Sequence, residues 1–116
     1  MITADNLYAY KAVVLDAYDG DTITVLIDLG LHVKVQAKVR LLGINAPELR
    51  GAQRDKGLLS KARIEKLILD KTVFIKTYKD RKEKYGRWLG EVYLADSDKS
   101  VNQTLIEEGF SWPYHD

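Results

Sequence analysis

Residues 22–42 read TITVLIDLGLHVKVQAKVRLL, a stretch in which apolar residues occupy nearly every second position. The alternation runs through Thr22–Leu29 and again through His32–Leu42, with Gly30 between the two segments. A period of two points alternate side chains to opposite faces of a strand, and glycine favours a tight turn between strands. The stretch therefore predicts a β-hairpin with one apolar face. The polar face of its second strand would carry His32, Lys34, Gln36, Lys38 and Arg40.

Three further segments have the β-branched and aromatic composition of strands, namely Tyr10–Tyr18, Thr72–Tyr78 and Arg87–Leu94. A helical spacing is found over Lys56–Leu69, where Leu58, Ala62 and Leu69 fall on one line with Ile64 and Ile68 beside it. This pattern predicts a helix with a broad apolar stripe, which also contains Lys61 and Glu65.

A second, short helix is expected near the end of the chain. Asn102 is a residue type that caps helix starts, and Val101 and Ile106 stand at the positions of a hydrophobic staple around it. Gly109 can end the helix in the left-handed conformation.

The predicted order is three strands, a helix, two strands and a helix. A helix between the third and fourth strands is the arrangement of a five-stranded Greek-key barrel of OB type. The sequence therefore predicts a mainly β fold with α (α+β), a five-stranded OB-fold barrel with two helices, and residues 1–116 forming one domain. An open α+β sheet is the alternative.

The composition is that of an ordinary globular protein, with 46% hydrophobic and 30% charged residues among 116. The chain has no cysteine, which excludes disulfides and thiolate metal sites. The first ten residues lack the basic run and apolar stretch of a signal peptide, and no stretch has the length and apolarity of a membrane span. We therefore expect a monomer without a membrane partner, cytoplasmic unless a precursor was trimmed.

Charge is distributed unevenly along the chain. Residues 91–116 contain six acids and one lysine, whereas the whole chain has a formal net charge of +1, so residues 1–90 are strongly basic. The densest basic stretch comprises Lys76, Lys79, Arg81, Lys82, Lys84 and Arg87. A basic face suits a polyanion such as nucleic acid, although a solvated charged loop would have the same composition.

Polar residues concentrate in three short segments at the ends of predicted strands. These are Asp19–Thr22, with the sequence DGDT, Arg40–Glu48, with the sequence RLLGINAPE, and Lys84–Arg87, with the sequence KYGR. Each alone could be an ordinary turn or loop. Their occurrence together, in this order and on this strand pattern, is hard to explain as turns alone.

These segments, together with Val101-Asn102, resemble the staphylococcal nuclease (thermonuclease) family. The family pattern is Asp-Gly-Asp-Thr, Arg-Leu-x-Gly-Ile-Asp-Ala-Pro-Glu, Tyr-Gly-Arg and then Val-Asn before a helix, and the likeness extends from about Ala12 to Tyr114. The resemblance implies an OB-fold barrel that hydrolyses phosphodiester bonds of DNA or RNA with the help of Ca²⁺.

The resemblance also implies a role for each matching position. Asp21, Asn45 and the carbonyl of Ala46 would be calcium ligands, and Asp19 would support the waters on the metal. Glu48 would be the general base, and Arg40 and Arg87 would bind the scissile phosphate. Lys84 and Tyr85 would hold a neighbouring phosphate.

Elementary chemistry agrees with such a set of groups. A hard cation held by oxygen ligands neutralises charge on the phosphate, and a carboxylate can accept a proton from the attacking water. The planar guanidinium of arginine matches two phosphate oxygens and stays charged at any working pH.

Asn45 stands where the family usually has aspartate. An amide oxygen can still ligate calcium, but one negative charge is lost, so cation affinity should fall. The protein is therefore either a weakened but active nuclease or a barrel that has begun to lose catalysis and only binds nucleic acid. The chain also stops at Asp116, where family members commonly continue into a third helix, which leaves Trp112 and Tyr114 either to close the core or to stack on a nucleobase.

Three functions remain in contention. The first is a nuclease with little sequence specificity that acts on single-stranded or locally open nucleic acid, since no groove-reading helix is evident. The second is a catalytically weakened OB-fold module that binds nucleic acid. The third is a protein-interaction barrel.

Overall fold

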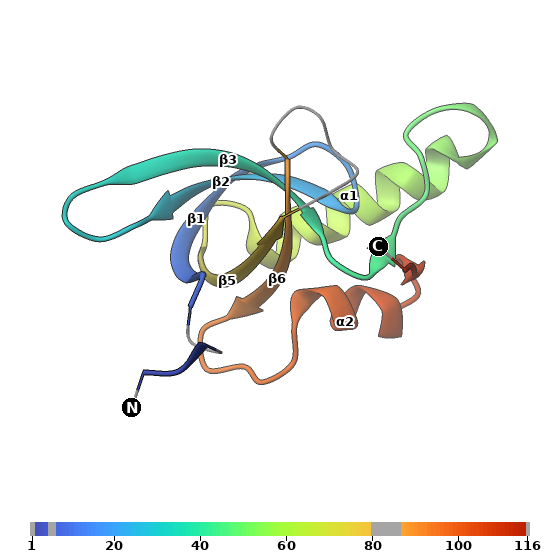
Figure 1. The fold of residues 1–116 in the computed structure, drawn as a ribbon. Helices are drawn as coiled ribbons and strands as arrows, with labels where there is room; N and C mark the ends of the chain where they lie inside the picture. Colours follow the sequence, from blue (N-terminus) through green and yellow to red (C-terminus); the bar gives the residue numbers. More distant parts are fainter. Residues whose placement is uncertain (1, 5–6, 80–86, 116) are drawn as a thin grey trace.

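The computed structural model, which describes residues 2–4, 7–79 and 87–115, contains five strands that close into a barrel in the order β1–β2–β3–β6–β5 (Figure 1). The barrel strands are β1 (Ala9–Ala17), β2 (Thr22–Asp28), β3 (Lys34–Leu41), β5 (Thr72–Lys79) and β6 (Trp88–Leu94). β3 and β6 pair in parallel, and the other neighbours are antiparallel. The closed mixed barrel with two helices confirms the predicted OB-like α+β fold, and the open-sheet alternative is wrong.

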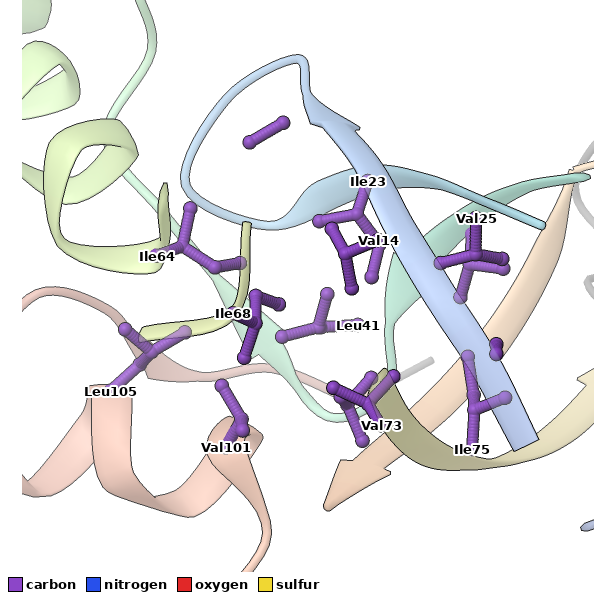
Figure 2. Packing of buried hydrophobic residues seen from close by; sticks show 14 of the residues in the cluster. Val14, Ile23, Val25, Leu41, Ile64, Ile68, Val73, Ile75, Val101 and Leu105 are labelled. Carbon is purple, nitrogen blue, oxygen red and sulfur yellow. The ribbon is translucent and has the colours of Figure 1, made fainter. Parts of the chain in front are cut away.

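The core fills the barrel and continues beneath both helices. Val14, Val25 and Leu41 are fully buried within the barrel, and Ile64 and Leu105 join the same cluster from the helices (Figure 2). Burying side chains of this size contributes about 1.5–3 kcal/mol each. The barrel and the helices therefore share one apolar core.

Only part of the predicted apolar face of β3 is buried. Val39 and Leu41 are inside the barrel, whereas Val33 and Val35 are about half exposed, at 51% and 46%. The cause is the short parallel pairing, because β6 meets β3 only over residues 39–41. The tip of the β2–β3 hairpin, where β2 ends and β3 begins, extends away from the barrel (Figure 1).

The long helix α1 (Arg54–Ile68) follows a single 3-10 turn, η2 (Gly51–Gln53), and buries only one edge of the expected stripe. Its buried residues are Gly57, Ser60, Ile64 and Ile68, while Leu58 is 41% exposed. The predicted stripe is therefore confirmed at Ile64 and Ile68, whereas its other edge, at Leu58 and Ala62, is exposed. The first turns of α1 approach other backbone so closely that small residues, rather than apolar ones, take the buried positions.

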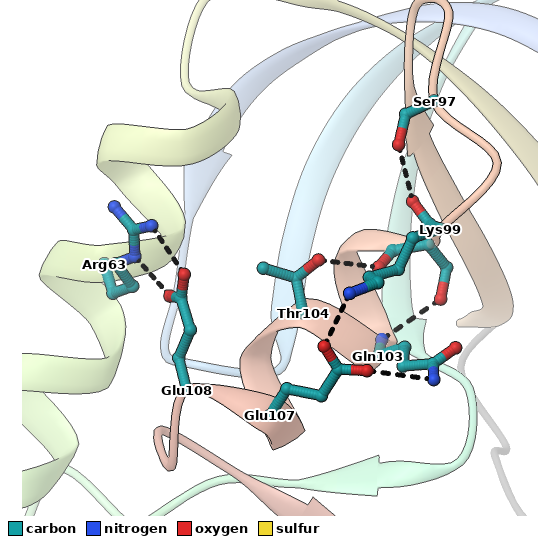
Figure 3. Close-up of polar contacts among 8 residues, drawn as sticks. Arg63, Ser97, Lys99, Gln103, Thr104, Glu107 and Glu108 are labelled. Carbon is teal, nitrogen blue, oxygen red and sulfur yellow. Dashed lines mark hydrogen bonds and ion pairs between the residues drawn. The ribbon is translucent and has the colours of Figure 1, made fainter.

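The short helix α2 (Val101–Glu107) is capped by Ser100, whose hydroxyl accepts a hydrogen bond from Gln103 N–H at 3.0 Å (Figure 3). The predicted cap at Asn102, and the staple built on it, are wrong. Gly109 has φ +83°, and the Phe110 N–H bonds the Leu105 carbonyl at 2.9 Å, which confirms the glycine ending. Among the described residues, no helix is long and apolar enough to cross a membrane.

Asn102 instead connects α2 to the barrel. Its buried amide donates to the carbonyls of Leu42 and Gly90 at 2.8 and 3.0 Å and accepts from Val92 N–H at 3.1 Å. Neither β3 nor α2 can shift without breaking these bonds. The family-like Val101-Asn102 pair therefore fixes where the chain leaves β3.

The chain after β3 and the chain after α2 meet in a two-stranded sheet. β4 (Ile44–Asn45) pairs antiparallel with β7 (Trp112–Pro113), so that Asn45 lies opposite Trp112. This pairing brings the end of the described chain beside the segment that leaves the barrel (Figure 1).

The three buried hydrogen bonds of Asn102 predict a large loss of stability on Asn102→Ala. The substitution removes a hydrogen bond from the carbonyls of Leu42 and Gly90 and from Val92 N–H, although the Gly90 carbonyl keeps its bond from Leu42 N–H. We therefore expect a loss of about 2–4 kcal/mol in the free energy of unfolding. Urea denaturation would measure it. Gln103→Ala, on the exposed side of the same helix, is the control, and an equal small loss in both variants would contradict the role given to Asn102.

Candidate functional site

A polar cleft of about 390 Å³ opens where three segments meet, namely the β1–β2 turn, the chain leaving β3 and the start of β6. Its walls are formed by Tyr18, Asp19, Asp21, Thr22, Lys38, Arg40, Asn45, Ala46, Glu48 and Arg87. The structure thus brings together seven of the nine residues singled out in the sequence. The other two, Lys84 and Tyr85, lie outside the described residues.

The acidic turn is tied to the chain that leaves β3. Asp21 is buried, and its Oδ2 accepts from Ala46 N–H at 2.9 Å while its Oδ1 accepts from Thr22 Oγ1 at 3.2 Å. Asp19 Oδ1 in turn accepts from Asp21 N–H at 3.1 Å. Both carboxylates are therefore held in place by backbone donors, one of them 25 residues away along the chain.

Burial and the neighbouring Asp21 carboxyl raise the pKa of Asp19 to about 6. Burial disfavours the charged carboxylate, and a second carboxylate close by disfavours it further. The pair therefore favours a proton or a cation between its members. Such a raised pKa in a cleft is typical of functional sites.

Arg40 is buried, with 9% of its surface exposed, and its guanidinium contacts the segment that follows. Nη2 donates to the Ile44 carbonyl at 2.9 Å and to Asn45 Oδ1 at 3.2 Å. The Tyr114 ring lies against the guanidinium, with 4.9 Å from Cζ to the ring centroid. These contacts fix the guanidinium in the wall of the cleft.

Trp112 and Tyr114 do not close the core, since they are 42% and 40% exposed. The expectation that placed them in the core is therefore wrong. The β4–β7 pairing carries them to the rim instead, where Tyr114 packs on Arg40.

Glu48 is exposed at the mouth of the cleft, and Arg87 is half-buried in its wall. The loop that carries Glu48 is held from α1. Gln53 accepts from Glu48 N–H at 3.1 Å, and Gly57 packs so closely on the carbonyls of Pro47 and Glu48 that a Cβ there would collide with them. The start of α1 therefore sets the position of Glu48.

Sequence reasoning missed Tyr18 and Lys38 as walls of the cleft. Tyr18 directly precedes Asp19, and Lys38 stands two positions before Arg40 on the polar face of β3. The period of two along β3 was the evidence that would have identified Lys38.

The donors in the cleft suit a hard cation. Among the described residues, no group of three His, Cys, Asp or Glu side chains could hold a metal ion by itself. The wall of the cleft nevertheless includes the carboxylates of Asp19 and Asp21 and the amide of Asn45, residues with the oxygen atoms that calcium prefers as ligands. The mutual repulsion within the Asp19–Asp21 pair is also what a cation would relieve.

The closed mixed barrel and its cleft define an OB-like α+β protein whose strand ends combine acids, arginines and an exposed glutamate. The family described as staphylococcal nuclease homologue matches residues 38–116, and the chain belongs to that family. The match includes Arg40, Asn45, Glu48 and Arg87, whereas the acidic turn precedes it and is joined to it by the Asp21–Ala46 hydrogen bond.

Several named proteins are similar to the chain. An uncharacterized endonuclease of Escherichia coli O157:H7 is 37% identical over 101 residues, which are 87% of this chain and 59% of that protein. Endonuclease YncB of Bacillus subtilis (strain 168) is 33% identical over 107 residues, 82% of this chain and 44% of YncB. Endonuclease YhcR of the same strain is 30% identical over 114 residues, 90% of this chain and 9% of YhcR. The chain therefore spans less than two thirds of the length of each.

The raised pKa of Asp19 predicts that Asp19→Asn stabilises the metal-free protein at neutral pH. The folded state of the wild type holds the Asp19 proton more tightly than the unfolded state does. The stability that this proton contributes to the wild type is complete below about pH 4 and is lost as the pH rises through about 6, whereas the amide of the variant does not titrate. The amide keeps an acceptor for Asp21 N–H and removes the charge.

We expect Asp19→Asn to be more stable than the wild type by on the order of 1 kcal/mol at pH 7.5, after allowing for solvent screening. The difference should vanish near pH 4. Urea unfolding at both pH values, in chelator-containing buffer, measures it. A difference that does not depend on pH would show that the Asp19 charge is not its cause.

Proposed function

We propose that this chain is a calcium-dependent nuclease that hydrolyses phosphodiester bonds of DNA or RNA with little sequence specificity. The observation that carries the proposal is the grouping, in one cleft, of a carboxylate pair, two arginines and an exposed glutamate. The family membership and the relatives named endonuclease support the same reaction. In this proposal residues 1–116 act as one domain and a monomer.

The phosphate would be bound by Arg40 and Arg87. Arg40 is already oriented by Ile44 and Tyr114, so little conformational freedom is lost when it binds an oxyanion. Two guanidinium groups stabilise the extra negative charge that develops as water attacks, and preorganised charges of this kind are often the largest contribution to catalysis.

The cation would be held by Asp21, the Asn45 amide oxygen and the Ala46 carbonyl, with Asp19 beside its waters. A bound calcium ion would neutralise charge on the phosphate and orient it. The backbone donors to Asp21 and Asp19 keep these carboxylates in position before the ion arrives. Lys84 and Tyr85 would hold a neighbouring phosphate.

Glu48 would accept the proton of the attacking water. It is exposed at the mouth of the cleft, where water reaches it. Its backbone is fixed by Gln53 at the end of η2 and by Gly57 in the first turn of α1. A positioned general base contributes typically ~10²–10⁴-fold to the rate.

One observation favours a second function, a catalytically weakened OB-fold module that binds nucleic acid. Asn45 Oδ1 accepts a hydrogen bond from Arg40, so in this structure the amide oxygen is directed to the guanidinium. Calcium ligation would compete with that bond, and the neutral amide lacks the charge that would favour the cation. Cleavage of a generic DNA over a calcium series separates the two functions.

Glu48→Gln should abolish most cleavage without unfolding the protein. The amide cannot accept the water's proton, so we expect kcat to fall by ~10²–10⁴-fold while thermal denaturation is nearly unchanged. Glu107→Gln, which alters an exposed glutamate of α2 outside the cleft, is the matched control. A folded Glu48→Gln variant with wild-type turnover would disprove the general-base role.

Asn45→Asp should lower the calcium concentration needed for cleavage. It adds one charge with little change of shape, so we expect calcium to bind more tightly by roughly tenfold. Because the new carboxylate would also pair with Arg40, the maximal rate should rise less than the affinity. Calorimetry and a calcium titration of cleavage measure both. No gain in affinity would remove Asn45 from the metal site.

A further inference from the structure

A second hollow, of about 410 Å³, adjoins the cleft on the side of Glu48. The two share Tyr18, Asp19 and Glu48, and the second is completed by Leu49 and Arg50. Glu48 therefore lies between the cleft and a space whose other walls are an aromatic ring, the Asp19 carboxyl group, an aliphatic side chain and an arginine. None of the roles assigned above uses this space.

Tyr18 is the most conspicuous wall of the hollow. Its side chain is 62% exposed, and Lys38 Nζ lies 5.5 Å from the ring centroid. Its backbone is fixed, since Tyr18 N–H donates to the Thr22 carbonyl at 2.9 Å. Gly20, two positions on, packs so tightly that a Cβ there would lie 2.7 Å from Ser60 Cβ. The ring is thus presented to solvent from a rigid turn.

The walls of the hollow match the two parts of a nucleotide. A nucleobase is flat and stacks on aromatic side chains whatever its identity, whereas the phosphate beside it pairs with a guanidinium. Tyr18 and Arg50 offer one surface of each kind. A base in a duplex has both faces covered by its neighbours, so only an unpaired base could stack on Tyr18.

We propose that this hollow is a subsite for the nucleotide next to the scissile phosphate. The base of that nucleotide would stack on Tyr18, and the phosphate on its far side from the scissile bond would bind Arg50. The inference rests on the proposed nuclease function and names a contact that only an unpaired strand could make. Because stacking accepts every base, the subsite explains how a strand is held without sequence specificity.

The test is Tyr18→Ala on a single-stranded DNA that carries one abasic residue, with every cleavage product resolved on a sequencing gel. In the wild type, cleavage at one of the bonds flanking the abasic residue should fall about 5-fold to 100-fold relative to the other bonds, the range expected for one lost stacking contact. In Tyr18→Ala that local fall should disappear, because the stacking partner is already gone. Tyr18→Phe, which keeps the ring, should behave as the wild type.

Phe74→Ala is the matched control, since Phe74 is an exposed aromatic residue of β5 outside both hollows. It should keep the wild-type pattern. The proposal is overturned if the wild type cleaves evenly on both sides of the abasic residue, or if the local fall persists in Tyr18→Ala.

Failure of the nuclease function would have a different outcome. If the wild type cleaves no substrate, fluorescence anisotropy with the same labelled strand measures binding alone. The absence of cleavage would by itself refute the nuclease function. Weaker binding by Tyr18→Ala than by Phe74→Ala and the wild type would then still support the subsite. Equal binding by all three proteins would overturn the subsite.

Discussion

The hydrogen bond from Ala46 N–H to the buried Asp21 carboxylate is the contact on which the cleft depends. It joins the β1–β2 turn to the chain that leaves β3, two segments 25 residues apart. A buried carboxylate costs several kcal/mol unless its oxygens are bonded, so this contact and the Thr22 hydroxyl determine where Asp21 can lie. Once Asp21 is fixed, the turn places Tyr18 and Asp19 in the wall of the cleft, and the bonded Ala46 places its neighbour Asn45 in the same cleft. The barrel supplies the rigid strand ends, and the hydrogen bond brings them together.

The sequence predicted the parts of the fold that depend on local pattern. The alternation on β2 and β3 gave the hairpin, and the order of elements gave the barrel. The pattern failed where long-range contacts decide. Val35 lies on the predicted apolar face of β3 but is exposed, because β6 pairs only with residues 39–41 of that strand and does not reach Val35. Leu58 has the right spacing for a core residue, yet Gly57 and Ser60 are buried in its place, since backbone approaches α1 there.

The candidate site was predictable to a similar extent and for similar reasons. Short motifs pointed to Asp21, Arg40 and Glu48 because their residue types and order are unusual, and the structure places all three around one cleft. The partners of these residues were not predictable. Asn102 has the chemistry of a helix cap, but its amide is used to join three backbone groups around β3 and β6. Only the three-dimensional fold shows that this polar residue at a helix start hydrogen-bonds to the backbone of other segments instead of capping its own helix.

Stability and function oppose each other at the acidic turn. A raised pKa at Asp19 means that, at neutral pH, the metal-free fold is less stable than it would be with a neutral side chain at that position. A fold selected for stability alone would replace one of the two acids. Their proximity is reasonable if a cation binds beside them, because burial and the neighbouring carboxyl, which together disfavour the Asp19 charge, would both be offset by the cation. If the proposed cation site is correct, Asp19 and Asp21 are its two charged ligating or supporting groups, because Asn45 contributes a neutral amide.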